Sequence, residues 1–309
     1  MDAEFFGDTE GSFFQLEPIS RARKLEMPML PRKLQERFPS TSALRIPPKK
    51  PGEKRILSAD IALMASTRTR NDATSIFINQ ALPTKSGRFI NNIVYTENLE
   101  GAHTEDVALL IRKYFEDFEC DYIALDCRNM GLGIYDALVR EISDAETGEI
   151  YPPLTCCNNA DLAARCTSRD AKKAIWGITA GAKLNSDCAL LLREGFRAGR
   201  IRLLENEFDA EEKLKEIKGY ASFSPEDKAV LLLPYVNTTL LVSEMIGLDH
   251  DESGGLVKLT EKRSARKDRY SSLSYNFYVA TELEKNLSRA ERRGDEVKES
   301  FIFRAPKIK

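Results

Sequence analysis

The pattern of hydrophobic and polar positions predicts a mixed α/β fold. Three runs rich in β-branched and aromatic residues are separated by turn-forming residues, which predicts three strands in an antiparallel meander. These runs are RILSADIAL (55–63), ATSIFINQAL (73–82) and RFINNIVYTE (88–97). Apolar residues at helical spacing then predict a helix over 104–118, with Thr104 as its cap. The next elements are a short strand of buried type, DYIALD (121–126), the turn CRNMGLG (127–133) and a helix over 134–142.

The second half of the chain predicts mainly helices, with single strands between them. Helices are expected over 186–199, 209–218 and 224–247, and strands at 200–204 and 254–261. We expect Pro234 to kink or divide the helix at 224–247, because proline cannot donate the helical hydrogen bond. A last helix begins near residue 266. Its apolar face is formed by Tyr270, Leu273, Phe277, Ala280 and Leu283.

Composition divides the chain into three parts. Residues 1–50 combine aromatic and charged residues and run into a Pro/Lys-rich passage, RIPPKKPGEK, which predicts an extended linker. The strand and helix pattern occupies residues 51–290, enough for one large domain. Residues 291–309 are predicted to form a tail.

Composition and charge argue against several classes of protein without identifying a function. The 309 residues include 46 Lys+Arg and 48 Asp+Glu, a net charge of -2, so a nucleic acid would have to be bound locally. Six cysteines without a CxxC pair and two histidines do not have the spacing of a zinc site or a disulfide framework. Apolar runs are too short for a membrane span, and the acidic N-terminus lacks the basic region of a signal peptide. We therefore expect a cytosolic protein without a membrane partner.

Three aspartates lie at positions that suggest a functional carboxylate. Asp60 lies within the first predicted strand, where burying an ionised carboxylate is unfavourable unless a cation or hydrogen-bond donors meet it. Asp126 ends the strand before the second helix, and Asp268 opens the last helix. Taken singly, Asp126 is explained as a turn cap and Asp268 as a first-turn residue favoured by the helix dipole. Together the three match the ribonuclease-H-like fold, in which strands one and four are neighbours and the late helix packs over their ends.

The chain more closely resembles the C-terminal nuclease domain of tailed-bacteriophage large terminase subunits, the DNA-packaging enzymes. Three passages carry the resemblance, SADIALMASTRTRNDATSIFI, YIALDCRNMGLGIYDAL and RKDRYSSLSYNFYVA. Supporting passages are FRAGRIRLL, LLLPYVNTTLLVSEM and the closing FIFRAPKI, so that the likeness covers about residues 50–309. It implies a central mixed β-sheet, an antiparallel meander plus parallel strands, flanked by helices.

The N-terminal passage MDAEFFGDTEGSFFQLEPISRAR resembles the segment that closes the ATPase domain of full-length terminases. The phosphate-binding pattern G-x-x-x-x-G-K-[ST] does not occur in this chain, which contains no Gly-Lys dipeptide. We therefore expect no ATPase activity from this chain alone.

The resemblance implies an endodeoxyribonuclease that cuts concatemeric double-stranded DNA by two-metal phosphodiester hydrolysis. Asp60 would bridge two divalent ions, Mg²⁺ or Mn²⁺, with Asp126 on one and Asp268 on the other, since these hard cations prefer carboxylates. Asp72 matches a further acidic position of the family, although a turn-forming Asn-Asp pair is the stronger interpretation. For His250 with Asp251, a solvated acidic loop is a stronger interpretation than an accessory ligand pair.

The implied DNA contacts are basic and insensitive to base sequence. They are Arg68, Arg70, Lys262, Arg263, Arg266, Lys267 and Arg269, for which a solvated helix face is the alternative interpretation. The implied partners are double-stranded DNA, a small terminase subunit, the portal and a terminase ATPase domain or chain, in the host cell cytoplasm. Two other functions stay open. These are another polynucleotidyl transferase, of resolvase or integrase type, and a non-catalytic DNA-packaging docking module.

Several smaller features have structural interpretations. Gly131 and Gly133 are expected to let the chain turn sharply beneath the metal site, because the third glycine of a dinucleotide fingerprint is absent. Trp176, Cys156 and Cys157 are expected to be packing residues.

Overall fold

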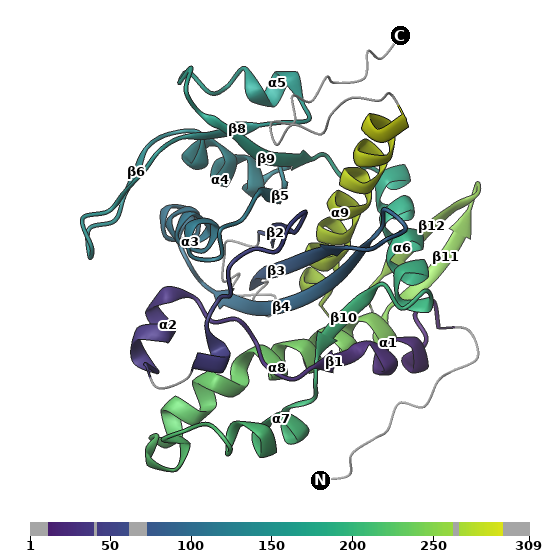
Figure 1. The fold of residues 1–309 in the computed structure, drawn as a ribbon. Coiled ribbons are helices and arrows are strands. Elements are labelled where there is room, and N and C mark those ends of the chain that lie inside the picture. Colours follow the sequence, from purple (N-terminus) through teal and green to yellow (C-terminus); the bar gives the residue numbers. More distant parts are fainter. Residues whose placement is uncertain (1–11, 40–41, 62–72, 262–265, 293–309) are drawn as a thin grey trace.

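The computed structural model describes residues 12–39, 42–61, 73–261 and 266–292, and within them it contains an eight-stranded mixed sheet (Figure 1). The strand order is β1-β10-β4-β3-β2-β5-β9-β8. These strands are β1 (Arg23–Leu25), β2 (Lys54–Asp60), β3 (Ala73–Pro83), β4 (Phe89–Glu100), β5 (Tyr122–Asp126), β8 (Leu154–Cys156), β9 (Lys172–Ile178) and β10 (Ile201–Leu204). Two hairpins lie outside the sheet, β6 (Ile142–Ser143) with β7 (Ile150–Tyr151) and β11 (Asp249–Ser253) with β12 (Leu256–Thr260).

The centre of the sheet confirms the predicted fold class. β2, β3 and β4 form the antiparallel meander, and β5 lies parallel to β2 on the side away from β3. The first strand of the meander and the strand after the first long helix are therefore neighbours, as in a ribonuclease-H-like fold. β9 extends the sheet parallel to β5, and β10 extends it on the other side, parallel to β4.

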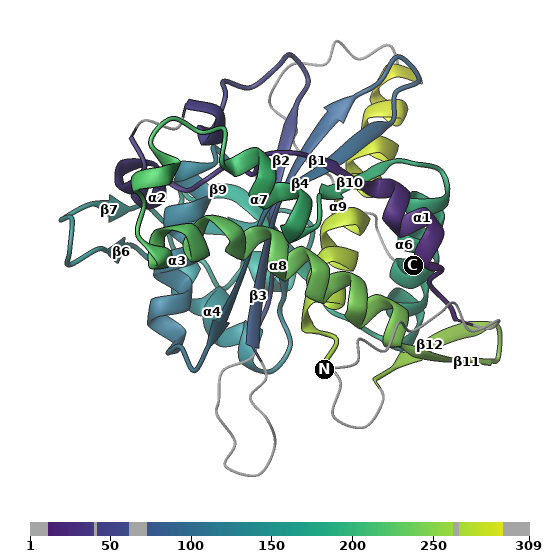
Figure 2. The same cartoon turned by 90° about the horizontal axis from the view of Figure 1, so that it is seen from below.

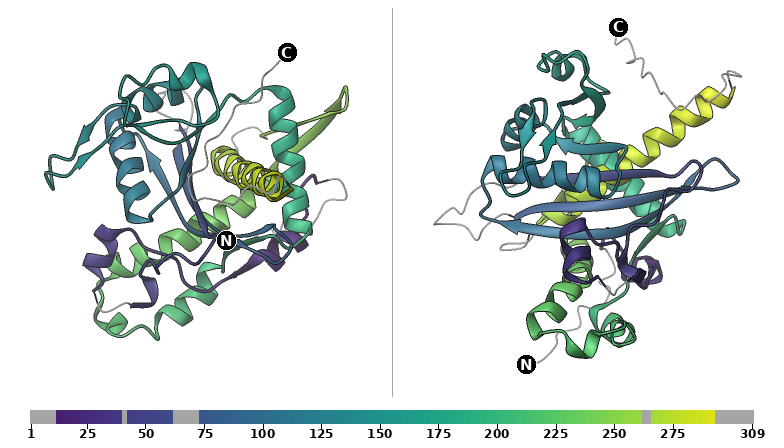
Figure 3. Two further views of the ribbon diagram at one scale, coloured as in Figure 1. Left: turned by 45° about the horizontal axis from the view of Figure 1, so that its top comes forward. Right: turned by 60° about the vertical axis from the view of Figure 1, so that its left-hand side comes forward.

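Helices cover both faces of the sheet (Figures 2 and 3). α3 (Thr104–Asp117) and α4 (Met130–Leu138) lie on one face, and α6 (Ala182–Arg197) and α9 (Asp268–Arg292) lie on the other. α8 (Pro225–Gly247) contributes its first half to the core of the α3 face and its second half to the core of the α9 face. Other described helices are α1 (Leu16–Ala22), α2 (Arg32–Arg37), α5 (Ala160–Ala163) and α7 (Glu207–Leu214), with 3-10 turns at Ser42–Leu44 and Tyr220–Ser222.

A polar seam formed by Ser58, Asn79, Ser272 and Asn276 fixes α9 to the sheet. The Asn276 amide donates to the carbonyl oxygen of Ile56 at 3.0 Å and to the Ser58 hydroxyl at 3.1 Å. The Ser58 and Ser272 hydroxyls lie 3.0 Å apart, and the Asn79 amide donates to the Asn276 side-chain oxygen at 2.8 Å. All four side chains are buried, so losing one bond would leave a polar group without water to replace its partner. The seam therefore sets the position of α9 along β2 and β3.

The N-terminal segment takes part in the fold. Phe13, Phe14 and Ile19 are buried in the core of the α9 face, and β1 pairs in parallel with β10. Residues 45–53, which include most of the Pro/Lys-rich passage, contain no helix or strand, and residues 51 and 52 form a turn. The packing of Phe13 and Phe14 thus attaches the segment before the Pro/Lys-rich passage to the rest of the molecule.

Two of the strands that the sequence pattern did not predict are β11 and β9, and different causes favour them. The acidic stretch Asp249–Ser253, expected to be a loop, is the exposed strand β11 and pairs with β12. The turn between them is formed by Gly254 and Gly255, both at positive φ, which is the glycine pair that favours a tight hairpin. The buried strand β9 was not among the predicted elements, because its first two residues are exposed lysines and its apolar run is short.

α8 is a single helix although it contains Pro234. Pro234 was expected to kink or divide this segment, and the division is wrong, since the helix runs unbroken from Pro225 to Gly247. Leu231, Tyr235 and Met245 are buried on both sides of the proline, and this packing offsets the missing hydrogen bond. Among the described residues, α8 alone is long and apolar enough to cross a membrane by length and composition, contrary to the expectation from its interrupted apolar runs. Core helices with a packed face meet the same criterion.

Candidate metal centre

Strand alternation brings Asp60 and Asp126 to the same place. Ala59 and Leu125 lie opposite each other in the parallel pair of β2 and β5, and both pack in the core of the α3 face. The next residue on each strand points to the opposite face, so both aspartates extend toward α9 from the carboxyl ends of adjacent strands. The backbone N–H of Arg128 donates to the Asp126 carboxylate at 3.0 Å. Burial nevertheless raises the pKa of Asp126.

Asp268, the first residue of α9, acts on the same site. The pKa of Asp60 is raised to about 7, first by burial and then by the negative charges of Asp268 and Asp126. The Ser271 hydroxyl and the Lys267 ammonium act in the opposite direction. The structure therefore brings both other predicted aspartates within electrostatic reach of Asp60.

The raised pKa of Asp60 predicts that the metal-free protein loses stability as the pH rises. An aspartate titrates near 3.8 ordinarily and at about 7 here, so the folded chain binds more protons between these values. The stabilising contribution is complete below the lower value and is lost as the pH rises through the higher one. We expect the Tm in EDTA to fall from about pH 5 to about pH 8 more steeply for the wild type than for Asp60→Asn. If thermal melts show that the Tm falls equally steeply with pH in the wild type and in Asp60→Asn, Asp60 is not an ionisable carboxylate enclosed by protein.

A cavity opens beside the two strand-end carboxylates. Its volume is about 350 Å³, and its lining includes Asp60, Asp126, Arg128, Asn185 and Tyr275. The Tyr275 hydroxyl donates to the Asn185 side-chain oxygen at 3.4 Å. Burial raises the pKa of Tyr275, and the charges of Asp126 and Asp60 raise it further. The cavity thus combines carboxylates with hydrogen-bond donors, which suits an anionic ligand once cations screen the carboxylates.

The close approach of α4 to this site requires Gly131. A Cβ atom at position 131 would lie 1.7 Å from the backbone oxygen of Asp126, whereas one at Gly133 would lie 3.8 Å from its nearest neighbour, Thr104 Cγ2. Both glycines lie inside α4, so the expectation that they form a sharp turn is wrong. The turn consists of residues 127–129, with Asn129 at a φ of 44°. Gly131 instead lets the helix pack directly on the strand end.

The three aspartates fit hard divalent cations by donor type. Among the residues that the structure describes, no three Asp, Glu, His or Cys side chains lie close enough to hold one metal ion together. The expected arrangement requires less, because each ion would be held by two carboxylates, Asp60 with Asp126 and Asp60 with Asp268. A cation beside Asp60 would relieve both the burial and the repulsion that raise its pKa.

The structure describes only some of the residues expected to contact DNA, and these differ in their exposure. Five site residues lie outside the described residues: Arg68, Arg70, Asp72, Lys262 and Arg263. Arg266 and Lys267 are partly exposed and form ion pairs at 3.3 Å with Glu100 and at 3.5 Å with Glu261. Arg269 points inward, and its guanidinium lies 2.9 Å from the carboxylate of Glu244. Its charge is neutralised inside the protein, which favours a structural role.

The other residues singled out in the sequence are either exposed or packed in the cores. His250 and Asp251 are exposed on β11, where the His250 ring lies 5.7 Å from that of Phe13, and neither lines the cavity beside Asp60. Trp176 and Cys156 are buried in the cores, and all six cysteines are free thiols.

Sequence reasoning missed four residues around the site. Arg128 and Tyr275 could have been found, because one follows Asp126 by two positions and the other follows Asp268 by two helical turns. Glu244 also carried a signal, as a single acid in the apolar run LLVSEMIG. Asn185, on α6, had none, since only the tertiary fold brings it to Tyr275.

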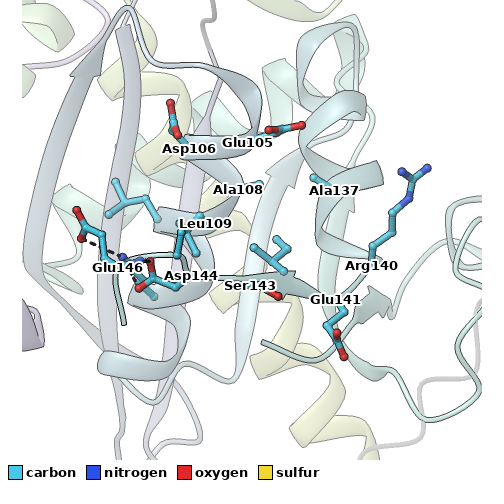
Figure 4. A pocket seen from close by; sticks show the side chains of 14 residues that line it. Glu105, Asp106, Ala108, Leu109, Ala137, Arg140, Glu141, Ser143, Asp144 and Glu146 are labelled. Carbon is cyan, nitrogen blue, oxygen red and sulfur yellow. Dashed lines mark hydrogen bonds and ion pairs between the residues drawn. The ribbon is translucent and has the colours of Figure 1, made fainter. Parts of the chain in front are cut away.

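A larger groove lies on the α3 face (Figure 4). It has a volume of about 690 Å³ and is lined by Glu105 and Asp106 of α3 and by Asp144 and Glu146 near β6. Lys113 forms an ion pair with Asp144 at 2.8 Å and helps to hold the pKa of Asp144 at about 2. These acids are exposed or already paired with a cation, so the groove does not offer the enclosed ionisable carboxylate found at Asp60.

Fold and site together define a ribonuclease-H-like α/β domain with an acidic centre. No protein-family model and no curated protein matches the chain. Solved large terminases are similar in fold. The nuclease of thermophilic phage G20c with bound cobalt has 9% identity and a TM-score of 0.43, over 87% of this chain and 98% of that one.

Two further solved structures give similar values. A mutant nuclease domain of the large terminase subunit gp2 of bacterial virus Sf6, with manganese and beta-thujaplicinol, has 7% identity and a TM-score of 0.46, over 86% of this chain and 98% of that one. The HK97 bacteriophage large terminase has 10% identity and a TM-score of 0.44, over 87% of this chain and 43% of that one.

Proposed function

We propose that this chain is a metal-dependent DNA endonuclease of the terminase kind. The position of Asp60 supports this proposal most strongly, because the negative charges of both Asp268 and Asp126 act on this largely enclosed carboxylate. Proteins tolerate such clusters of like charge mainly where a cation or a shared proton stabilises them. The terminase assignment comes from the resemblance of the sequence passages around these three residues.

The acidic side chains would hold the ions and orient the reaction. When bound, two divalent ions activate a water molecule and stabilise the charge on the phosphate and on the leaving oxygen. Asp60 would bind both ions, Asp126 one of them and Asp268 the other. The Arg128 N–H keeps the Asp126 carboxylate in a fixed orientation, and the close contact at Gly131 keeps the end of β5 in place.

The substrate would be bound through phosphate contacts. Arg266 and Lys267 are partly exposed beside Asp268, and Arg128 lines the cavity. We propose that the chain cuts concatemeric DNA in the host cell cytoplasm, together with a small terminase subunit, the portal and a terminase ATPase domain or chain.

Cleavage of plasmid DNA tests the proposal directly. With Mn²⁺ or Mg²⁺ the chain is expected to convert supercoiled plasmid to nicked and linear forms, and EDTA is expected to stop the reaction. Linear duplex should be cut without preference for branched junctions. Preferential cleavage of junctions would favour a resolvase instead. A folded chain that cleaves no DNA would favour the docking module, which the spacing of the aspartates also allows.

Duplex binding is expected to weaken steeply with salt, because phosphate contacts release bound counterions. Replacing Arg266 or Lys267 by alanine should reduce the slope of log Kd against log salt by about 1 each. Fluorescence anisotropy with a labelled duplex measures this slope. Lys33→Ala, at a lysine that is 85% exposed on α2, is the control and should leave the slope unchanged. Unchanged slopes in all three variants would place the DNA elsewhere.

A further inference from the structure

Glu244 holds the first turn of α9 from outside the helix. Its carboxylate accepts a hydrogen bond from the backbone N–H of Tyr270 at 3.1 Å and forms an ion pair with Arg269 at 2.9 Å. The first N–H groups of a helix have no partner within that helix. Glu244, on α8, therefore provides the acceptor that a capping residue ordinarily provides. The two charged side chains are only 6% and 10% exposed, so the contact is largely shielded from water.

Arg269 extends this connection to the sheet. The hydrogen bonds around Asn98 are satisfied when its amide oxygen faces the guanidinium. In that orientation Arg269 Nε donates to Asn98 at 2.9 Å, and the Asn98 amide donates to the Ser75 hydroxyl at 3.0 Å. Ser75 lies directly opposite Asp60 in the β2–β3 pair. A chain of contacts therefore leads from the turn that carries Asp268 to the strand position beside Asp60.

Asp268 requires such a connection more than its two partners do. Asp60 and Asp126 belong to strands inside the sheet, whereas Asp268 is the first residue of a helix, and helix ends fray. Side chains that share an ion must be held to within about 0.5 Å of the productive geometry. The polar seam fixes α9 at Ser272 and Asn276, beginning one turn after Asp268. Glu244 and Arg269 fix its start.

We propose that Glu244 and Arg269 are positioning residues, which keep Asp268 at the distance from Asp60 that shared binding of a divalent cation requires. This inference rests on the proposed function. Glu244 accepts the backbone N–H of Tyr270, two residues after Asp268, so its contact lies in the same helical turn as Asp268. The ion pair with Arg269 neutralises Glu244, which then supports the site without competing for the cation.

A matched control lies near the other end of the same helix. Glu284 is also a buried carboxylate of about 10% exposure, forms an ion pair with Arg200 at 2.9 Å and accepts the backbone N–H of Phe89 at 2.6 Å. Its contacts resemble those of Glu244, but they anchor a distant part of α9. Glu284→Ala therefore reproduces the structural loss without touching the turn that carries Asp268.

Isothermal titration of Mn²⁺ into the full chain tests the proposal, together with hydrogen exchange of the amides of residues 268–271. Glu244→Ala is expected to weaken Mn²⁺ binding by about 10-fold or more and to speed the exchange of these amides. Glu244→Gln, which keeps an acceptor for Tyr270 N–H, should weaken binding less. Glu284→Ala should leave the Mn²⁺ Kd within about two-fold of the wild type.

The outcomes separate this inference from the proposed function. Wild-type Mn²⁺ binding in folded Glu244→Ala or Glu244→Gln would overturn the positioning role, and so would equal weakening in Glu284→Ala. Neither result would contradict the proposed nuclease function. A wild-type chain that binds Mn²⁺ with the expected dependence on Glu244 but cuts no DNA would overturn the nuclease and keep the positioning role. Absence of Mn²⁺ binding to the wild type would overturn both.

Discussion

Asp60→Asn is expected to reduce the rate of DNA cleavage at least about 100-fold, equivalent to about 2.7 kcal/mol, while the protein stays folded. Asparagine keeps one oxygen but removes the charge that two cations would share at this position. The same change removes the unfavourable burial of a carboxylate, so the variant should be at least as stable as the wild type in EDTA at about pH 8. Plasmid nicking with Mn²⁺ and thermal melting together measure both effects.

The control for this experiment is Asp136→Asn. Asp136 lies on α4 and pairs at the surface with Arg165, so its loss should change the cleavage rate by no more than about two-fold and stability only slightly. Loss of activity in both variants would indicate a general effect of acidic charge. Full activity in a folded Asp60→Asn protein would exclude Asp60 as a metal ligand.

Gly131→Ala is expected to destabilise the protein by about 3 kcal/mol or more, at the upper end of the range for overpacking. The added Cβ atom would lie 1.7 Å from the backbone oxygen of Asp126, and backbone cannot yield as a flexible side chain can. Either α4 or the end of β5 must move, and movement of β5 displaces the Asp126 carboxylate. Chemical denaturation measures the loss of stability, and titration with Mn²⁺ measures the effect on the site.

Gly133→Ala provides the comparison within the same helix. Its Cβ atom would have Thr104 Cγ2 as nearest neighbour, at an ordinary contact distance of 3.8 Å. Because alanine favours helix over glycine by about 1 kcal/mol, this variant should be unchanged or slightly more stable. Similar stability of the two variants would show that α4 does not pack on the strand end as described.

The sequence predicted the fold where patterns were local. The meander, α3 and β5 follow from strand alternation and helical spacing, and their order fixes which strands can be neighbours. Asp60 could be singled out because a carboxylate inside a buried strand is unfavourable without a partner. Its neighbours in space, Asp126 and Asp268, could be proposed only because a known fold places such positions together.

Tertiary contacts decide what the sequence does not predict. β9 is a strand through its pairing with β5 and β8 rather than through its own alternation. Arg269 stands in a basic run and suggests a DNA contact, but Glu244, 25 positions earlier, draws it into the protein. Gly131 suggests a turn, whereas it serves the close approach of a helix to the Asp126 backbone. In each case the deciding contact forms only in the folded chain.

Because of the polar seam beneath α9, the register of this helix on the sheet can be lost without a loss in the stability of the protein. A helix held only by apolar side chains can slide by one turn, about 5.4 Å, since one hydrocarbon surface replaces another. Such a slide would separate the Asn276 amide from the Ile56 carbonyl and leave both without partners. Evolution could therefore exchange the seam for equally large apolar residues with little change in melting temperature, yet the helix would then occupy several registers. A protein whose chemistry depends on the first residue of that helix would lose its function without unfolding.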